Sequence, residues 1–336
     1  MHKKTFIVTG LLLVLAAGIL AYHFYAAASA EETLDNTIRE LSGRADTTLS
    51  INYSGIEVSP FSGDIRISDI TVIRSQNIQR ASRADLDLGY ADFLNFMIWG
   101  AEAGLKRVTS GKLIIGDLSY TNRSSFTEVK LDSLSVDYSG NLWNLIVLGV
   151  TGGNAQIEHT FRAVGNRFRY YQPESTAGAV TADSLHLNLL FGSHGSTSSF
   201  TNRVRLRHIT WNPPENIQEK YRFFIQGFGY ETDAIPFREL LADVEYGSGT
   251  GIVNLSEIKI TSELFTIALE GELLLHANEL SRSELRNTSV RLYEMSSRFQ
   301  NVLQQIGKLT GLKFPEAGEQ MQVRVKGPLT APDFEF

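Results

Sequence analysis

The residues of this chain that could do chemistry are a pair of carboxylates and seven scattered histidines. Asp85 and Asp87 are two residues apart and would share one face of a strand, as the carboxylates of a glycosidase or a Ca²⁺ site can. They also alternate with Leu86 and Leu88, the pattern of a polar face opposite an apolar one. This alternation favours a structural interpretation, and we expect Asp85 and Asp87 on the solvent side of a strand.

No other set of residues has the spacing of a catalytic or metal site. The histidines lack a second ligand at metal spacing, and the chain has no cysteine. The nucleophile motif Gly-x-Ser-x-Gly and the glycine motifs that bind phosphates or dinucleotides do not occur. The sequence therefore predicts a protein that is not an enzyme and that uses no metal and no cofactor. A formal charge of -6 argues against nucleic acid as a partner.

The first thirty residues are typical of a membrane anchor. Lys3 and Lys4 precede an apolar run from Phe6 to Tyr25, and about 20 helical residues span roughly 30 Å, the thickness of a bilayer core. Because basic flanks stay inside, the N-terminus is expected in the cytoplasm. The residues expected to anchor the chain are Phe6, Leu12, Leu15, Ile19 and Tyr25. The other interpretation is a cleavable signal peptide ending at Ala28-Ser29-Ala30; both export residues 31 to 336.

The rest of the chain has the period of two that strands produce. A longer pattern, apolar at i, i+2, i+5 and i+7, occurs five times. Its members are Ile65, Ile67, Ile70, Val72; Leu113, Ile115, Leu118, Tyr120; Val129, Leu131, Leu134, Val136; Val204, Leu206, Ile209, Trp211; and Val253, Leu255, Ile258, Ile260. The middle residues, such as Ser68-Asp69, shift the alternation by one, so that both apolar pairs face the same side. Either a β-bulge, which would curve the sheet, or a kink between two short strands explains this.

Two further segments alternate without interruption and carry an in-phase glycine, Phe265 to Leu275 and Met321 to Leu329. A glycine on the apolar face marks close backbone approach or sharp curvature. Helical spacing is expected for Asp92 to Gly104, Ile235 to Glu245 and residues 294 to 309, whereas Leu142 to Leu148 fits either type. The predicted fold is mainly β, an elongated, strongly twisted and curved antiparallel sheet with a few short helices after the anchor.

A curved sheet with few covering helices must bury its apolar face in one of three ways. It can close on itself, dimerise, or hold apolar ligand chains in a groove. The residues expected to line such a groove are Ile65, Ile67, Ile70, Val72, Leu113, Ile115, Val253, Leu255, Phe265, Ile267 and Leu269. An ordinary core filled by its own side chains is the alternative.

The order of these features resembles the AsmA-like family of Gram-negative bacteria. The resemblance lies in the anchor followed by Tyr53 to Val72, in Ala84 to Gly89, in Phe93 to Trp99 and in Ser110 to Tyr120. The last segment, Val323 to Phe334, is also similar to type II secretion protein N. The resemblance implies an inner-membrane protein with one span, residues 1–30, and a taco-like periplasmic domain, residues 31–336, with an apolar groove.

The function implied by the resemblance is phospholipid handling or transport, or outer-membrane homeostasis, with membrane phospholipid as the partner. The alternative is a structural accessory of a secretion or envelope assembly. Such a protein would act through contacts with other envelope or secretion-system proteins, and its apolar face would be a closed core.

Overall fold

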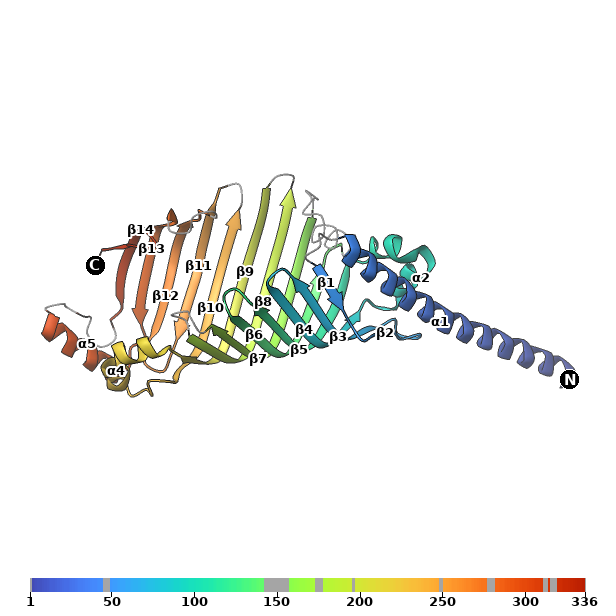
Figure 1. The fold of residues 1–336 in the computed structure, drawn as a ribbon, viewed down its shortest axis with the longest axis horizontal. Helices are drawn as coiled ribbons and strands as arrows, with labels where there is room; N and C mark the ends of the chain where they lie inside the picture. The colour runs from blue at the N-terminus through green and yellow to red at the C-terminus, as the bar shows by residue number, and fades with distance from the viewer. Residues whose placement is uncertain are drawn as a thin grey trace.

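The computed structural model describes residues 2–44, 49–141, 157–172, 178–194, 197–247, 250–276, 282–310, 314 and 319–335. These residues form one 15-stranded antiparallel sheet and four helices (Figure 1). The elements are α1 (His2–Arg44), β1 (Leu49–Asn52), β2 (Gly55–Val58), β3 (Ile65–Arg74), β4 (Asn77–Asp87), α2 (Tyr90–Leu105), β5 (Ser110–Asn122), β6 (Thr127–Ser139), β7 (Ile157–Gln172), β8 (Gly178–His194), β9 (Thr197–Asn212), α4 (Glu215–Gly227), β10 (Ile235–Gly247), β11 (Ile252–Thr261), β12 (Thr266–Leu274), β13 (Glu284–Tyr293), α5 (Ser297–Thr310), β14 (Met321–Pro328) and β15 (Asp333–Glu335).

The sheet is a continuous meander. From β3 to β15 each strand pairs with the next one in the chain, while β1 and β2 both pair with β3. Position along the sheet therefore follows position in the sequence, as the colours of Figure 1 show. The prediction of a mainly β chain with one large antiparallel sheet is confirmed.

A row of unpaired positions crosses the sheet from β3 to β10. Ser68 pairs with Arg83 and Ile70 with Ala81, but Asp69 and the opposite Ser82 do not pair. The gap continues on the following strands, and we call the whole row the crease: Asp69, Ser82, Asp117, Asp132, Arg167, Asp183, His208 and Arg238. On alternate strands the crease residue has a positive φ, 51° at Asp69, 49° at Asp117, 52° at Arg167 and 49° at His208. This left-handed conformation turns the strand and interrupts the ladder.

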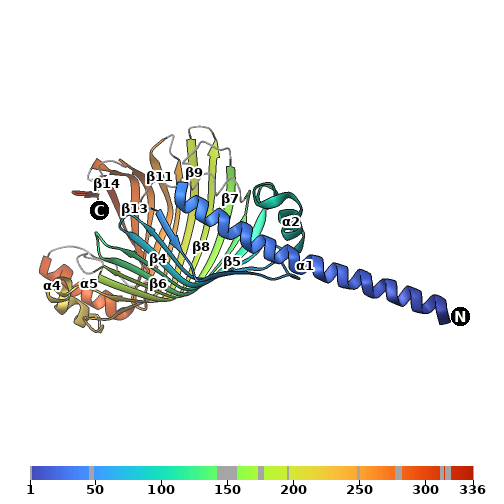
Figure 2. The same cartoon turned by 45° about the vertical axis from the view of Figure 1, so that its right-hand side comes forward.

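The crease folds the sheet into a trough with two walls (Figure 2). Polar crease side chains pair where the backbone does not: Ser82 Oγ donates to Asp117 Oδ2 at 2.9 Å, and His208 Nδ1 lies 3.2 Å from Asp183 Oδ2. Both members of the histidine pair are about three quarters exposed. Leu206 and Ile209, on either side of His208, instead join one apolar cluster. The polar crease residues therefore lie outside the bend and the apolar residues inside it.

All five copies of the i, i+2, i+5, i+7 pattern span such an irregularity, and both expected forms occur. In four copies the register is unchanged across the crease, so the strand kinks without gaining a residue. In the fifth copy the register shifts between Leu255 and Ile258. Similar shifts continue from β10 to β14 and form a second line across the sheet.

Substitutions at Asp117 test whether the left-handed backbone conformation at the crease depends on the type of residue at that position. Asp and Asn tolerate this conformation, whereas a β-branched residue does not. We expect Asp117→Val to lower the free energy of unfolding by roughly 1 to 2 kcal/mol, and Asp117→Asn to stay within about 0.5 kcal/mol of the parent. Urea unfolding followed by circular dichroism measures both, and equal losses would argue against the kink as the cause.

The helices agree with the sequence in part. The helices expected at 92–104 and 294–309 are present as α2 and α5, whereas Ile235 to Glu245 is strand β10, so the helix predicted there is wrong. The crease at Arg238 places Phe237 and Leu240 on one face three residues apart, and this spacing imitates a helix. Helix α4 was not predicted. The ambiguous run 142–148 lies outside the described residues.

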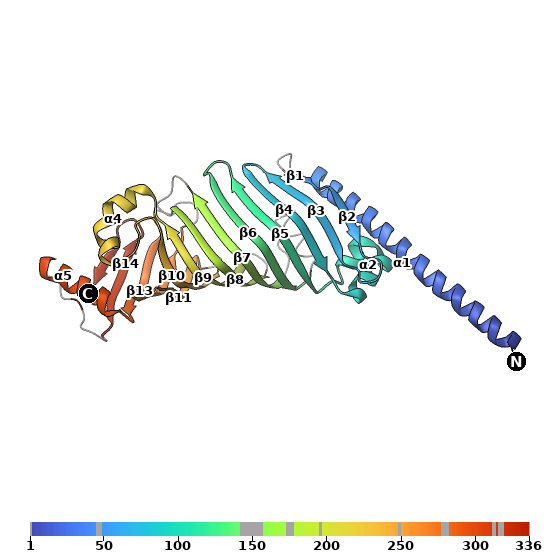
Figure 3. The same ribbon diagram turned by 90° about the horizontal axis from the view of Figure 1, so that it is seen from below.

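Helix α1 is continuous to Arg44. Ala27 and Ala30 pack in a core with β2, β3 and α2, while the first half of the helix projects from the sheet (Figures 1 and 3). Among the residues whose side chains the structure describes, which in α1 begin at residue 16, no helix is long and apolar enough to span a membrane. Of the expected anchor residues, Ile19 and Tyr25 are exposed, and the side chains of Phe6, Leu12 and Leu15 lie outside the described part.

Candidate functional site: the apolar inner face

Two rows of residues run along the inside of the trough from β3 to β14, one residue per strand. The first row is Ile65, Leu86, Leu113, Val136, Ala163, Leu187, Val204, Ala242, Ile258, Leu269, Val290 and Val323. The second row is Ile67, Ala84, Ile115, Leu134, Gly165, Leu185, Leu206, Leu240, Ile260, Ile267, Leu292 and Met321. Each residue pairs with the next in its row, and every member is apolar. We call the two rows the apolar stripe.

Helices cover the apolar face at its two ends. At the β3 end Ile65 is buried in the core with Phe93 of α2 and Ala30 of α1. Towards the other end Phe299 of α5 packs on Phe265, with 4.7 Å between the ring centroids. Between the ends, residues such as Ile115 and Leu187 remain partly exposed. Among the described residues, the middle of the stripe is therefore an apolar surface that is sheltered by the walls and partly accessible, although Ala163 and Leu206 are buried there.

The structure gathers six of the predicted groove residues in the stripe. Its first row includes Ile65, Leu113 and Leu269, and its second row includes Ile67, Ile115 and Ile267. Ile70 and Val72 follow the crease and belong to the other wall, whereas Val253 and Leu255 precede the register shift on β11. Phe265 precedes β12 and packs on α5.

The sequence prediction missed the small members of the stripe and some of the large ones, such as Leu185 and Leu187. Ala84, Ala163, Gly165 and Ala242 belong to the stripe only because their strands pair in this register. The alternation of Leu185 and Leu187 in the sequence was a signal that could have identified that pair.

A wholly apolar cavity of about 120 Å³ opens on the stripe near α2. It is lined by Leu86, Leu88, Gly111, Leu113, Val136, Tyr138 and Phe161. Cavities of this size and polarity can hold a small apolar group. The cavity therefore offers a local seat for hydrocarbon at the beginning of the trough.

Tyr138, which lines this cavity, pairs with the buried His159. The Tyr138 Oη to His159 Nδ1 distance is 2.7 Å, and the rings stack with 5.6 Å between centroids. Burial raises the pKa of Tyr138 to about 12, so its hydroxyl stays protonated beside the imidazole. Burial lowers the pKa of His159 below its ordinary value, so the imidazole stays neutral in the folded protein.

This histidine predicts that the fold weakens in acid. Below about pH 6.5 the unfolded chain binds a proton at His159 that the folded chain does not bind, because burial lowers the pKa of His159 in the folded protein. The stability that comes from keeping His159 neutral is fully present above this pH. On acidification we expect the free energy of unfolding to fall by up to about 1.4 kcal/mol per pH unit. Urea unfolding between pH 8 and 5 should show this slope reduced in His159→Phe. The exposed His208→Asn serves as the control; if its slope falls as much, the assignment to His159 is wrong.

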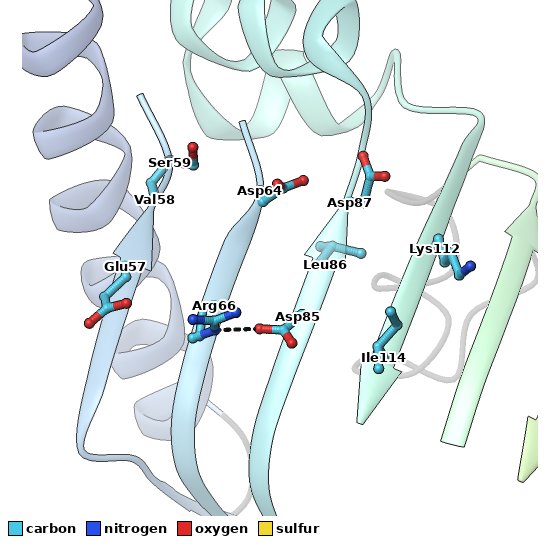
Figure 4. Close-up of a pocket in the computed structure, with 10 residues that line it drawn as sticks. All are labelled: Glu57, Val58, Ser59, Asp64, Arg66, Asp85, Leu86, Asp87, Lys112 and Ile114. Carbon is cyan, nitrogen blue, oxygen red and sulfur yellow. Dashed lines mark hydrogen bonds and ion pairs between the residues drawn. The ribbon is translucent and has the colours of Figure 1, made fainter. Parts of the chain in front are cut away.

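The outer face is mostly polar, and it carries a charged pocket of about 540 Å³ whose lining residues are drawn in Figure 4. Arg66 Nε donates to Asp85 Oδ1 at 2.6 Å, and Asp87 Oδ1 accepts the backbone N–H of Gly89 at 2.8 Å. Ile114 also lines this pocket. Asp85 and Asp87 are thus engaged in an ion pair and a turn on the polar side, as expected. Within the described residues, no group of His, Asp and Glu could hold a metal ion.

The fold and its stripe define a class: an antiparallel meander folded along a polar crease around a continuous apolar inner face. No protein-family model and no curated protein matches the chain.

Proposed function

We propose that the chain is an inner-membrane-anchored periplasmic protein whose trough holds the acyl chains of phospholipids and supports their handling or transport. The observation that carries the proposal is the apolar stripe, which extends without a polar member from β3 to β14. Burying hydrocarbon is favourable by about 0.8 kcal/mol per CH₂ group. The stripe members that remain partly exposed between the helix-covered ends, such as Ile115 and Leu187, can supply this energy, whereas the mostly polar outer face cannot.

The resemblance to AsmA-like proteins supports the same role. It adds the single N-terminal membrane span with a cytoplasmic N-terminus, the periplasmic location of the sheet and a connection with outer-membrane homeostasis. The proposed role is binding, with no catalytic step and no metal or cofactor.

Photocrosslinking at two adjacent isoleucines tests the proposal. Ile115 lies in the stripe, and Ile114, which is 36% exposed, lines the charged pocket on the outer face. With p-benzoylphenylalanine at each position of the full chain in cells, irradiation should join phospholipid to position 115 at least tenfold more than to position 114. Mass spectrometry of the purified adduct identifies the lipid. Equal or absent lipid adducts at both positions would refute the groove.

A second candidate role, a structural accessory that acts through protein contacts, is favoured by α4. On this helix the Phe223 side chain is 83% exposed, and Tyr221 and Phe224 are also exposed. Such a patch is typical of protein contact sites. The same photocrosslinker at position 223 would join a partner protein in this case. The accessory role would replace the lipid role if position 223 gave a protein adduct while position 115 gave no lipid adduct.

A further inference from the structure

Aromatic side chains from three separate segments meet around α1 where it leaves the sheet. Phe24 of α1 lies edge-on to Phe61 of the β2–β3 turn, with 5.8 Å between ring centroids. The His23 ring lies 5.8 Å from both Phe61 and Tyr90, the first residue of α2. Tyr90 Oη is also 3.2 Å from His23 Nε2. We call Phe24, Phe61 and Tyr90 the aromatic collar.

The collar is exposed although Phe24 contacts Phe61 directly and Tyr90 is linked to Phe61 through the His23 ring. Phe24 is 59% exposed and Phe61 56%, and on α2 the neighbouring Ile98 and Trp99 are also more than half exposed. Single exposed aromatics are ordinary, but a patch assembled from segments distant in the sequence marks an interaction surface. Nothing in the sequence alone would place Phe61 or Tyr90 beside Phe24.

The collar lies beside α1 at the point where the side chains of this helix change from exposed to buried. Ile19 and Leu20 are exposed, whereas Ala26 and Ala30 are buried against the sheet domain. Figures 1 and 3 show α2 beside α1 at the place where α1 projects from the β3 end of the trough. The collar therefore faces the same surroundings as the projecting apolar part of α1.

We propose that the collar, with Ile98 and Trp99, lies in the headgroup interface of the bilayer that α1 enters and seats the β3 end of the trough on the lipid surface. The inference rests on the proposed membrane anchor. A bilayer is favoured as the occupant because the surface continues the exposed apolar residues of α1 and is rich in aromatic rings, which concentrate at membrane interfaces. Arg107, 4.6 Å above the Trp99 ring, adds a cation that suits the headgroup level.

The consequence concerns how lipid reaches the stripe. Ile65, the first member of the stripe, shares its core with α1 and with Phe93 of α2. If the collar lies in the interface, the helix-covered end of the trough is seated on the leaflet. The apolar cavity beside Leu86 and Leu113 is then the part of the stripe near this end that an acyl chain would reach first.

Because the chain has no cysteine, single cysteines can be labelled without background. We would attach an NBD fluorophore to Phe61→Cys, Ile98→Cys, Ala16→Cys or Phe126→Cys in the full chain, reconstituted in phosphatidylethanolamine–phosphatidylglycerol vesicles containing brominated lipids. Position 16 is about 12 Å along the helix from Phe24, inside the proposed span. Position 126 is a matched exposed aromatic on the β5–β6 turn, 59% exposed. Lipids brominated near the headgroup should quench positions 61 and 98 at least fivefold more than position 126, and deeply brominated lipids should quench position 16.

The outcomes separate the collar from the anchor. Quenching at position 16, with 61 and 98 behaving like 126, would reject the collar and keep the anchor. No quenching at any of the four positions would reject the anchor, and the collar with it. A blue shift at 61 and 98 that grows with protein concentration without bromine quenching would mean that a second copy of the chain covers the patch, and would also reject the proposal.

Discussion

Ile115→Asp is expected to remove phospholipid from the trough, and Ile114→Asp is expected to leave it bound. Ile115 belongs to the apolar stripe, so the new carboxylate would lie where we propose that acyl chains bind. Burying an ionised carboxylate costs several kcal/mol, and each 1.4 kcal/mol changes an affinity tenfold. We therefore expect more than a tenfold fall in phospholipid per mole of purified full chain, measured by lipid extraction and mass spectrometry.

Ile114→Asp is a closely matched control for Ile115→Asp. Ile114→Asp introduces the same charge one position away, but on the polar outer face where Lys112 and Arg66 line the same pocket. Circular dichroism melting of both variants separates loss of lipid from loss of fold. The groove would be disproved if Ile115→Asp kept its lipid while folded. If that variant unfolded and Ile114→Asp did not, Ile115 would be core, as the accessory role requires.

Gly271→Ala is expected to be among the most destabilising small substitutions in the sheet. Gly271 has a φ of 152° and lies in the second line of irregular pairing, between Glu270 and Glu272. A Cβ at this position would lie 2.5 Å from Thr288 Cα and 2.6 Å from Thr288 Oγ1, and Thr288 is itself buried. Because backbone cannot move aside cheaply, we expect a loss of about 2 to 4 kcal/mol in the free energy of unfolding.

Gly247→Ala is the matched control at the end of β10. The nearest atom to its added Cβ is Thr250 Oγ1 at 3.7 Å, an ordinary contact, and its φ is not in the left-handed region. Its stability should stay within about 1 kcal/mol of the parent, because a compatible alanine mainly restricts the unfolded chain. Urea midpoints of the two variants give the comparison. Equal midpoints would show that β12 and β13 can separate without cost and that the close approach is not a constraint.

The kink positions were predictable because each kink changes the spacing of the apolar residues within its own strand. A strand that keeps both halves of its apolar face inward across a left-handed residue must shift its alternation, as Ile67 and Ile70 do around Asp69. The same shift in the alternation of apolar residues produced the wrong helix prediction at Phe237 and Leu240, where a spacing of three residues resembles that of a helix. Without the neighbouring strands, a spacing of three residues fits both structures.

The sequence by itself determined the strand periodicity, the positions of the kinks and of the bulge, α2, α5 and six residues of the stripe, because side-chain alternation is a property of consecutive residues. Only the tertiary structure decided that the kinks align into a crease, that Ala163 and Gly165 complete the stripe, and that Phe61 and Tyr90 join Phe24. These features depend on which residues of different strands and helices lie opposite one another. Cross-strand register and helix docking are set by packing between distant segments, which no local pattern records.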